Sequence, residues 1–266
     1  MYPVLMLGKI PVPMYGIMAL IGFVLAITFL LFHCKNYGIR KDDAFHASCY
    51  AIIGILVGSK LLSILSLLPR VITHFSLLLK YPMDVLSYLF GGFVFYGGLI
   101  GGAFGVYLYT RIYKLSWIPY MNASAPSIPL FHAFGRIGCL LAGCCYGMEY
   151  SGPFAIIYPL SEYTNHDGIT SRFPTPVIEI LFNLCLFMVL ALLSKRKPKP
   201  GRLLGIYIIA YSVMRFTLEF FRGDSARGTD LGFSTSQWIS LILFPVGIYL
   251  VSGHFLKRLQ KKTPRS

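Results

Sequence analysis

The stretch M-Y-G-I-M-A-L-I-G-F-V-L-A-I-T-F-L-L-F-H, residues 14–33, contains no Lys, Arg, Asp or Glu. A helix of about 20 apolar residues is long enough to cross a bilayer. The chain is 56% hydrophobic and 13% charged, and its mean hydropathy is +0.66, a composition typical of integral membrane proteins. We therefore predict an all-α integral membrane protein with about seven transmembrane helices, in a single domain over residues 1–266. The other apolar windows lie near 48–68, 88–109, 128–146, 177–194, 203–221 and 237–256.

The basic residues predict the orientation of these helices. The net charge is +14, and most of the 24 Lys and Arg residues lie in short segments between or after the apolar windows, as in K-R-K-P-K-P-G-R at 195–202. The positive-inside rule then places the N-terminus outside and the C-terminus in the cytoplasm. The polar segment near 147–176 becomes an extracytoplasmic loop. Basic residues spread in this way do not form a nucleic-acid-binding face, so we expect no nucleic acid partner.

Charged residues inside the predicted helices are candidates for function, because charge at membrane depth is costly unless it is paired or faces a polar cavity. Arg215 and Glu219 are four residues apart in R-F-T-L-E-F-F-R, which places them on one helix face, and Arg222 continues that face toward the outer end. One interpretation is an ion pair within the helix that only allows charge in the membrane. The other is an anion site, in which Glu219 orients an arginine toward a phosphate. Arg136, in a different predicted helix, favours the anion site.

The segment Y-G-G-L-I-G-G-A-F-G, residues 96–105, is rich in glycine. Small residues at this spacing are typical of close helix packing. The alternative is that Gly97 and Gly98 present backbone N–H groups to a lipid headgroup. The Tyr96 hydroxyl would then donate or accept a further hydrogen bond.

The segment G-R-I-G-C-L-L-A-G-C-C-Y-G, residues 135–147, carries Cys139, Cys144 and Cys145. A C-x-x-C motif is absent, and an adjacent pair such as Cys144-Cys145 is unfavourable for chelating one zinc ion. We therefore predict no metal and no cofactor. The three cysteines are interpreted either as small apolar packing residues or as a thiol site. A thiol site would hold a redox pair or a thiol that carries an acyl or alkyl group.

Taken together, G-R-I-G, Y-G-G-L-I-G-G and R-F-T-L-E-F-F-R-G-D resemble the prolipoprotein diacylglyceryl transferase family. The resemblance covers nearly the whole chain. It implies a multi-pass protein of the bacterial cytoplasmic (inner) membrane. This protein would transfer diacylglyceryl from phosphatidylglycerol to the lipobox cysteine of a preprolipoprotein, forming a thioether and releasing glycerol phosphate. Supporting pieces follow in order: M-Y-G-I-M-A-L-I-G-F at 14–23, G-S-K-L at 58–61, F-P-T-P-V-I-E at 173–179, G-I-Y-I-I-A-Y at 205–211 and S-T-S-Q-W-I-S at 234–240.

The resemblance also implies roles for individual residues. Arg136 and Arg215 would hold the phosphate, and Glu219 would position Arg215. Glu179 matches the acidic residue that ends the family's H-P-x-Q-x-Y-E stretch. Tyr15 matches the tyrosine of the family's first span.

The chain departs from the family pattern at several polar positions. The family has H-G-G-L-I-G where this chain begins with Tyr96, and H-P where this chain has Phe173. Its G-R-I-G-N-x-x-N-G-E becomes G-R-I-G-C-L-L-A-G-C, so that Cys139, Ala142 and Cys144 replace two asparagines and a glutamate.

His132 is the candidate that replaces the missing histidine. It lies four residues before Arg136, so both face one way if this stretch is helical. We hypothesise that His132 is the general base, because a pKa near neutrality suits a group that accepts a thiol proton. The alternative is a histidine that is hydrogen-bonded at the helix entrance. Two other functions stay open: a non-catalytic lipid-binding or transport protein of the same fold, and a membrane thiol oxidoreductase.

Overall fold

The computed structural model describes residues 2–8, 10–73, 83, 95–158, 170–223, 229–230 and 232–253. Within them the regular secondary structure is helical apart from three short two-stranded antiparallel sheets, and a helix lies in each of the seven predicted windows. Residues 88–94 and 254–256 of these windows, and residues 159–169 of the predicted loop, lie outside the described residues. The described part of the chain has four helices that are long and apolar enough to cross a membrane: Met14–Tyr37, Lys41–Leu68, Thr175–Ser194 and Thr235–Ser252. The predicted helical membrane protein is thus confirmed in outline.

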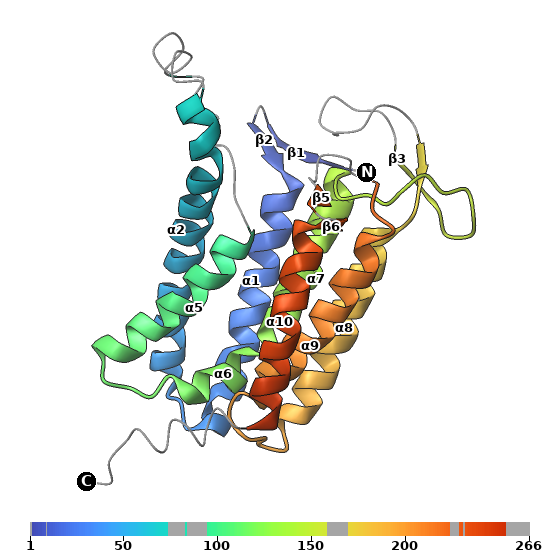
Figure 1. The fold of residues 1–266 in the computed structure, drawn as a ribbon. Helices are drawn as coiled ribbons and strands as arrows, with labels where there is room; N and C mark the ends of the chain where they lie inside the picture. Colours follow the sequence, from blue (N-terminus) through green and yellow to red (C-terminus); the bar gives the residue numbers. More distant parts are fainter. Residues whose placement is uncertain are drawn as a thin grey trace. The chain divides into compact units, whose positions relative to one another are not determined.

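The chain divides into two compact units, Met1–Tyr37 with Met121–Ser266, and Gly38–Tyr120. In the first unit α1 packs against α7, α7 against α8, α8 against α9, and α9 against α10, and Figure 1 shows these helices side by side. Their bounds are α1 Met14–His33, α7 Ser127–Ala142, α8 Thr175–Ser194, α9 Arg202–Glu219 and α10 Thr235–Ser252. The unit also contains the 3₁₀-helix η1 (Cys34–Tyr37) and the antiparallel pairs β1 (Val4–Leu7) with β2 (Ile10–Pro13), β3 (Ile156–Tyr158) with β4 (Thr170–Arg172), and β5 (Thr229–Asp230) with β6 (Phe233–Ser234).

Local sequence signals determine where these helices begin and end. A capping box starts α10: the Ser234 hydroxyl accepts from the Gln237 N–H at 3.3 Å, and the Gln237 side chain accepts from the Ser234 N–H at 2.9 Å. Pro176 stands in the first turn of α8, where a missing N–H costs nothing. At the other end of a helix, Gly143 stops α7 with φ +70°, a conformation that favours glycine.

The basic connector at 195–202 is held by a single buried side chain, that of Asn122. Its amide nitrogen donates to the carbonyls of Pro198 at 3.0 Å and Lys199 at 2.9 Å. Its amide oxygen accepts from the Leu203 N–H at 3.1 Å, which is one of the unpaired donors at the start of α9. Asn122 therefore fixes the entry of α9, the helix that carries Arg215 and Glu219.

The second unit is built on α2 (Lys41–Thr73) and α5 (Phe95–Ile112), and α6 (Ile118–Ser124) contains the boundary with the first unit. The two long helices touch through their glycines. A Cβ on Gly101 would lie 2.0 Å from the Gly54 carbonyl oxygen, and one on Gly97 would lie 2.3 Å from that of Gly58. Gly98 is also buried. These contacts support close helix packing for the 96–105 segment. Tyr96 lies in the first turn of α5, and its side chain is outside the described residues.

We predict that Gly101→Ala lowers the free energy of unfolding by about 1–3 kcal/mol, because the added methyl group forces α2 and α5 apart. The matched control is Gly16→Ala in α1, where the nearest atom would lie 4.0 Å from the added carbon. Thermal unfolding of the purified proteins in detergent compares the two. A Gly101→Ala protein that unfolds at the temperature of the unmodified chain would contradict the packing.

Candidate functional site

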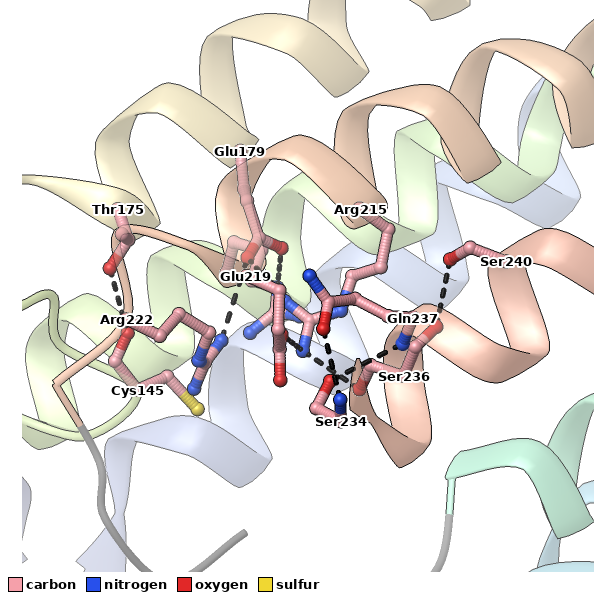
Figure 2. A network of polar contacts seen from close by, with 11 residues as sticks. Cys145, Thr175, Glu179, Arg215, Glu219, Arg222, Ser234, Ser236, Gln237 and Ser240 are labelled. Carbon is pink, nitrogen blue, oxygen red and sulfur yellow. Dashed lines mark hydrogen bonds and ion pairs between the residues drawn. The ribbon is translucent and has the colours of Figure 1, made fainter. Parts of the chain in front are cut away.

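The first unit contains a buried cluster of ion pairs centred on Glu179 of α8, whose exposed fraction is 1%. One oxygen of its carboxylate, Oε2, contacts Nε of Arg136 on α7. The other, Oε1, lies 3.5 Å from Nη1 of Arg215 on α9 and 3.7 Å from Nη1 of Arg222. Figure 2 shows the carboxylate with Arg215 on one side and Arg222 on the other. One acidic side chain thus gathers arginines from three parts of the chain.

Arg215 has two further partners. Its Nη2 lies 2.6 Å from Oε2 of Glu219, the residue four positions later on α9, as the sequence spacing predicted. The same nitrogen donates to the Ser236 hydroxyl on α10 at 3.1 Å (Figure 2). The Arg215–Glu219 pair is therefore one part of a cluster that joins α7, α8, α9 and α10.

The spacing predicted that Arg222 continues the helix face of Arg215 and Glu219, but the structure places it elsewhere. Because α9 ends at Glu219, Arg222 does not continue its face. It lies in the following segment, where it forms an isolated antiparallel bridge with Gly147. A Cβ on Gly147 would lie 2.6 Å from the Phe173 carbonyl oxygen and 2.9 Å from that of Phe221, so this position requires glycine. Close backbone contact therefore aims Arg222 at Glu179.

The charges of the cluster favour an anion. Three guanidinium groups face two carboxylates, which leaves one positive charge in a buried setting. The side chain of Arg136 is 20% exposed, whereas those of Arg215 and Arg222 are 5% and 3% exposed. Arg136 is therefore the arginine that solvent or a ligand reaches most directly. Guanidinium groups bind phosphate oxygens in a forked, charge-assisted geometry.

The three cysteines of the 135–147 segment come together beside this cluster. Their sulfur atoms lie within 4.8 Å of one another, although Cys139 belongs to α7 and the other two follow the helix. Cys145 adopts a left-handed backbone conformation, with φ +59°, and its carbonyl accepts from the Thr175 hydroxyl at 3.0 Å. The Cys144 thiol donates to the Cys139 carbonyl at 3.6 Å, so the turn folds back on the last residues of α7.

His132 lies on α7 one helical turn before Arg136, as predicted. Its Nδ1 is 3.0 Å from the Tyr207 hydroxyl, and its ring centroid is 5.0 Å from that of Tyr211, both on α9. The imidazole is thus held within aromatic packing between α7 and α9. This geometry supports a hydrogen-bonded structural histidine, the alternative to the general base.

Tyr15 is the second residue of α1, and about half of its surface is exposed. A Cβ on Gly138 would lie 3.1 Å from both Cα and Cδ2 of Tyr15, so the tyrosine packs directly on the G-R-I-G segment of α7. It is thereby placed on the helix that carries both Arg136 and Cys139.

A groove on α9 and α10 offers an apolar surface near the ion pairs. Ser240, one of its lining residues, donates to the Ser236 carbonyl at 2.8 Å, and Ser236 in turn accepts from Arg215. The groove is lined by Ser212, Val213, Phe216, Thr217, Ser240, Leu241 and Phe244.

Two contacts in the site were not anticipated from the sequence. Ser236 follows the start of α10 within a capping box, a signal that identifies the helix start but not the partner on α9. Tyr207 is one of many tyrosines in apolar windows, and nothing in its local sequence marks it as the partner of His132. Both contacts arise from helices that are distant in sequence.

These features define a helical membrane protein with a buried, net-positive site and adjacent thiols. Residues 3–252 match the family model described as "Prolipoprotein diacylglyceryl transferase". The chain therefore belongs to the prolipoprotein diacylglyceryl transferase family, and the family predicted from its motifs is confirmed.

Similar proteins support this assignment over most of the chain. The "phosphatidylglycerol–prolipoprotein diacylglyceryl transferase" of Clostridium tetani is 35% identical over 238 residues, which is 89% of this chain and 90% of the relative. The "phosphatidylglycerol–prolipoprotein diacylglyceryl transferase 2" of Clostridium perfringens is 32% identical over 243 residues, 91% of both chains. The "phosphatidylglycerol–prolipoprotein diacylglyceryl transferase" of Nitrosomonas europaea is 30% identical over 252 residues, which is 92% of this chain and 86% of the relative. These names agree with the predicted transferase, and none favours the alternative functions.

We predict that Glu179→Gln destabilises the protein by about 3–5 kcal/mol, because it leaves buried guanidinium groups without their shared carboxylate. Glu149→Gln is the matched control. The Glu149 side chain is 77% exposed and 4.0 Å from Arg172, and loss of an exposed pair costs about 1 kcal/mol or less. Thermal unfolding in detergent measures both variants. Equal unfolding temperatures for the two would contradict the central position of Glu179.

Proposed function

We propose that this protein transfers the diacylglyceryl group of phosphatidylglycerol to the cysteine thiol of a lipobox-containing preprolipoprotein and releases glycerol phosphate. The observation that carries this proposal is the convergence of Arg136, Arg215 and Arg222 on two carboxylates, an excess of one positive charge among the described groups of the cluster. That charge matches the single negative charge of a phosphodiester. The printed names of the similar proteins describe the same donor and acceptor.

The reaction breaks the bond between the diacylglyceryl carbon and a phosphate oxygen. Negative charge builds up on the departing phosphate, and preorganised donors that meet it lower the barrier most effectively. In this proposal Arg136 and Arg215 contact the phosphate, and Arg222 adds positive charge. Glu219 holds the Arg215 fork, and Ser236 limits its rotation by accepting from Nη2.

The proposal includes a topology in the bacterial inner membrane. Residues 1–266 would form one polytopic domain with seven membrane-spanning helices. The N-terminus would then lie outside and the C-terminus in the cytoplasm. The polar segment near 147–176 would then be extracytoplasmic. Arg222 and the three cysteines lie at the end of the bundle that adjoins this segment, where a secreted precursor would approach.

We predict that Arg136→Ala and Arg215→Ala each slow the release of glycerol phosphate by about 10²-fold or more, because each removes a donor to the departing phosphate. Arg111→Ala, an exposed arginine of α5, is the control and should keep the unmodified rate. The assay uses purified protein, phosphatidylglycerol micelles and a lipobox peptide, and follows glycerol phosphate together with thioether formation. Arg136→Lys keeps the positive charge but removes the forked guanidinium group. Its rate therefore separates the contribution of the forked geometry from that of the charge.

Equal rates in Arg136→Ala and Arg111→Ala would contradict the phosphate site. An unmodified chain that binds phosphatidylglycerol without releasing glycerol phosphate would favour the lipid-binding or transport function. Formation of disulfides in the peptide would favour the thiol oxidoreductase.

The general-base hypothesis for His132 is tested in the same assay. It predicts a loss of about 10²-fold or more in His132→Ala, the contribution typical of general base catalysis, and full activity in Tyr96→Phe. The reverse pattern contradicts it. Tyr207→Phe is the matched control, because it removes the hydrogen bond at Nδ1 and keeps the imidazole. Equal losses in His132→Ala and Tyr207→Phe would assign His132 a structural role.

A further inference from the structure

Cys139, Cys144 and Cys145 form a site that the phosphate cluster does not use. Their sulfur atoms lie within 4.8 Å of one another, and all three are free thiols. A zinc ion about 2.3 Å from each of three sulfurs separates those sulfurs by about 3.8 Å in tetrahedral geometry. Small side-chain rotations therefore suffice to bring the three thiols around one ion.

One residue of this turn, Cys145, has a backbone conformation that is unfavourable for its residue type. Gly143 and Cys145 both have positive φ, at +70° and +59°, and a left-handed conformation costs a residue other than glycine about 1–2 kcal/mol. The turn is fixed at both ends: the Cys144 N–H donates to the Cys139 carbonyl at 3.1 Å, and the Thr175 hydroxyl donates to the Cys145 carbonyl at 3.0 Å. An adjacent cysteine pair is a poor chelate in regular structure. Here the left-handed turn directs both sulfurs toward Cys139.

We propose that Cys139, Cys144 and Cys145 bind one Zn²⁺ ion and leave its fourth coordination position open for the thiol of the acceptor. Thiolates are ligands that select zinc and other thiophilic metals. Three protein ligands with one open position are typical of catalytic zinc sites, whereas structural sites use four protein ligands. This proposal replaces the expectation of no metal that followed from sequence spacing.

The charges near the three thiols fit this assignment. Three thiolates and one Zn²⁺ ion carry one net negative charge. Arg136 lies three residues before Cys139 on α7. Figure 2 shows the Cys145 sulfur on the side of Arg222. Arg136 and Arg222 therefore place positive charge beside the three proposed ligands.

The role of the open position rests on the proposed transferase function. The acceptor sulfur takes the fourth position of Zn²⁺ as its S–H bond breaks, and the proton goes to water, because a thiol that binds zinc is deprotonated. The sulfur then forms a bond to the diacylglyceryl carbon. The bond from that carbon to the phosphate oxygen breaks, and its electron pair leaves with glycerol phosphate. The neutral thioether that results is a weaker ligand and dissociates.

The first test is metal binding by the full chain. Protein purified in detergent with a reductant and stripped by a chelator is titrated with Co²⁺. We expect one Co²⁺ per chain, a thiolate-to-cobalt charge-transfer band, and displacement of this band by Zn²⁺. Cys144→Ser and Cys145→Ser should each weaken binding at least 10-fold. The triple variant Cys34→Ser/Cys49→Ser/Cys185→Ser is the matched control and should keep the band.

Three results would overturn the site. These are the absence of a charge-transfer band in the unmodified chain, a band that survives Cys145→Ser, and a band that the triple control loses. Gel filtration verifies that each variant is folded. A disulfide between two of the three thiols in protein isolated without reductant would also contradict the proposal.

The second test concerns the acceptor. A lipobox peptide with its cysteine should shift the visible spectrum of the Co²⁺-loaded protein, and the same peptide with serine should not. Chelation should slow glycerol phosphate release at least 10-fold, and added Zn²⁺ should restore it.

The outcomes separate the two proposals. Release that is equally fast with and without Zn²⁺ would overturn the role of the cation and leave the transferase standing. If no glycerol phosphate is released under either condition, the transferase is wrong, and the Co²⁺ spectra still decide whether the thiols bind metal. If the cysteine peptide leaves the Co²⁺ spectrum unchanged, the acceptor thiol does not bind at the fourth coordination position, and that part of the proposal is wrong.

Discussion

The packing of the described bundle depends on the ion pairs that the buried carboxylate of Glu179 forms with three arginines. Three arginines at this depth would repel one another and lose their hydration, so each needs a nearby negative charge. Glu179 supplies it to all three, and Glu219 adds a second negative charge beside Arg215. Because the arginines come from α7, α9 and the segment after α9, their attraction to one carboxylate on α8 also constrains how these elements pack. The excess positive charge is then concentrated at this cluster, which is why we propose it as the place where a phosphate binds.

The arginines keep this geometry because α9 is fixed at both of its ends. At the first end Asn122 accepts from the Leu203 N–H and holds the connector that precedes the helix. At the other end, the bridge between Arg222 and Gly147 joins the chain to the segment that follows the cysteines. A guanidinium fork on a helix held in this way loses little additional freedom when it meets a phosphate. The fold thus contributes to the site through restraint of α9 as much as through the charged groups themselves.

The sequence predicted those parts of the structure that depend on local patterns. Apolar windows located the helices because bilayer thickness sets their length, and the spacing of Arg215 and Glu219 predicted their contact because four residues make about one turn. The family motifs also associated Arg136 with Arg215. The three-way role of Glu179, the contact of Ser236 and the partner of His132 depend on helix packing over long sequence separations, which periodicity does not encode. The end of α9 at Glu219 was missed because Phe220 and Phe221 continue the apolar pattern. The approach of the cysteines required the left-handed Cys145, for which the adjacent pair gave no signal.

The proposed reaction has two parts, departure of the phosphate and activation of the acceptor thiol. On α7 and the turn that follows it, the departures of this chain from its family pattern concern the second part. The arginines and glutamates that would hold the phosphate, Arg136, Arg215, Glu179 and Glu219, match the family pattern. The altered positions of α7 and its C-terminal turn lie where an acceptor sulfur would arrive, and two of them are cysteines. Arg136 and Cys139 are three residues apart on α7. In the proposed reaction one helix would therefore present both the group that meets the departing oxygen and a group that meets the incoming sulfur. Replacement of amide and carboxylate groups by thiols changes which hydrogen bonds this end of the helix makes, but it preserves the positive charge beside it. If both proposals hold, the site keeps the lipid donor of its family and differs in how it activates the acceptor thiol.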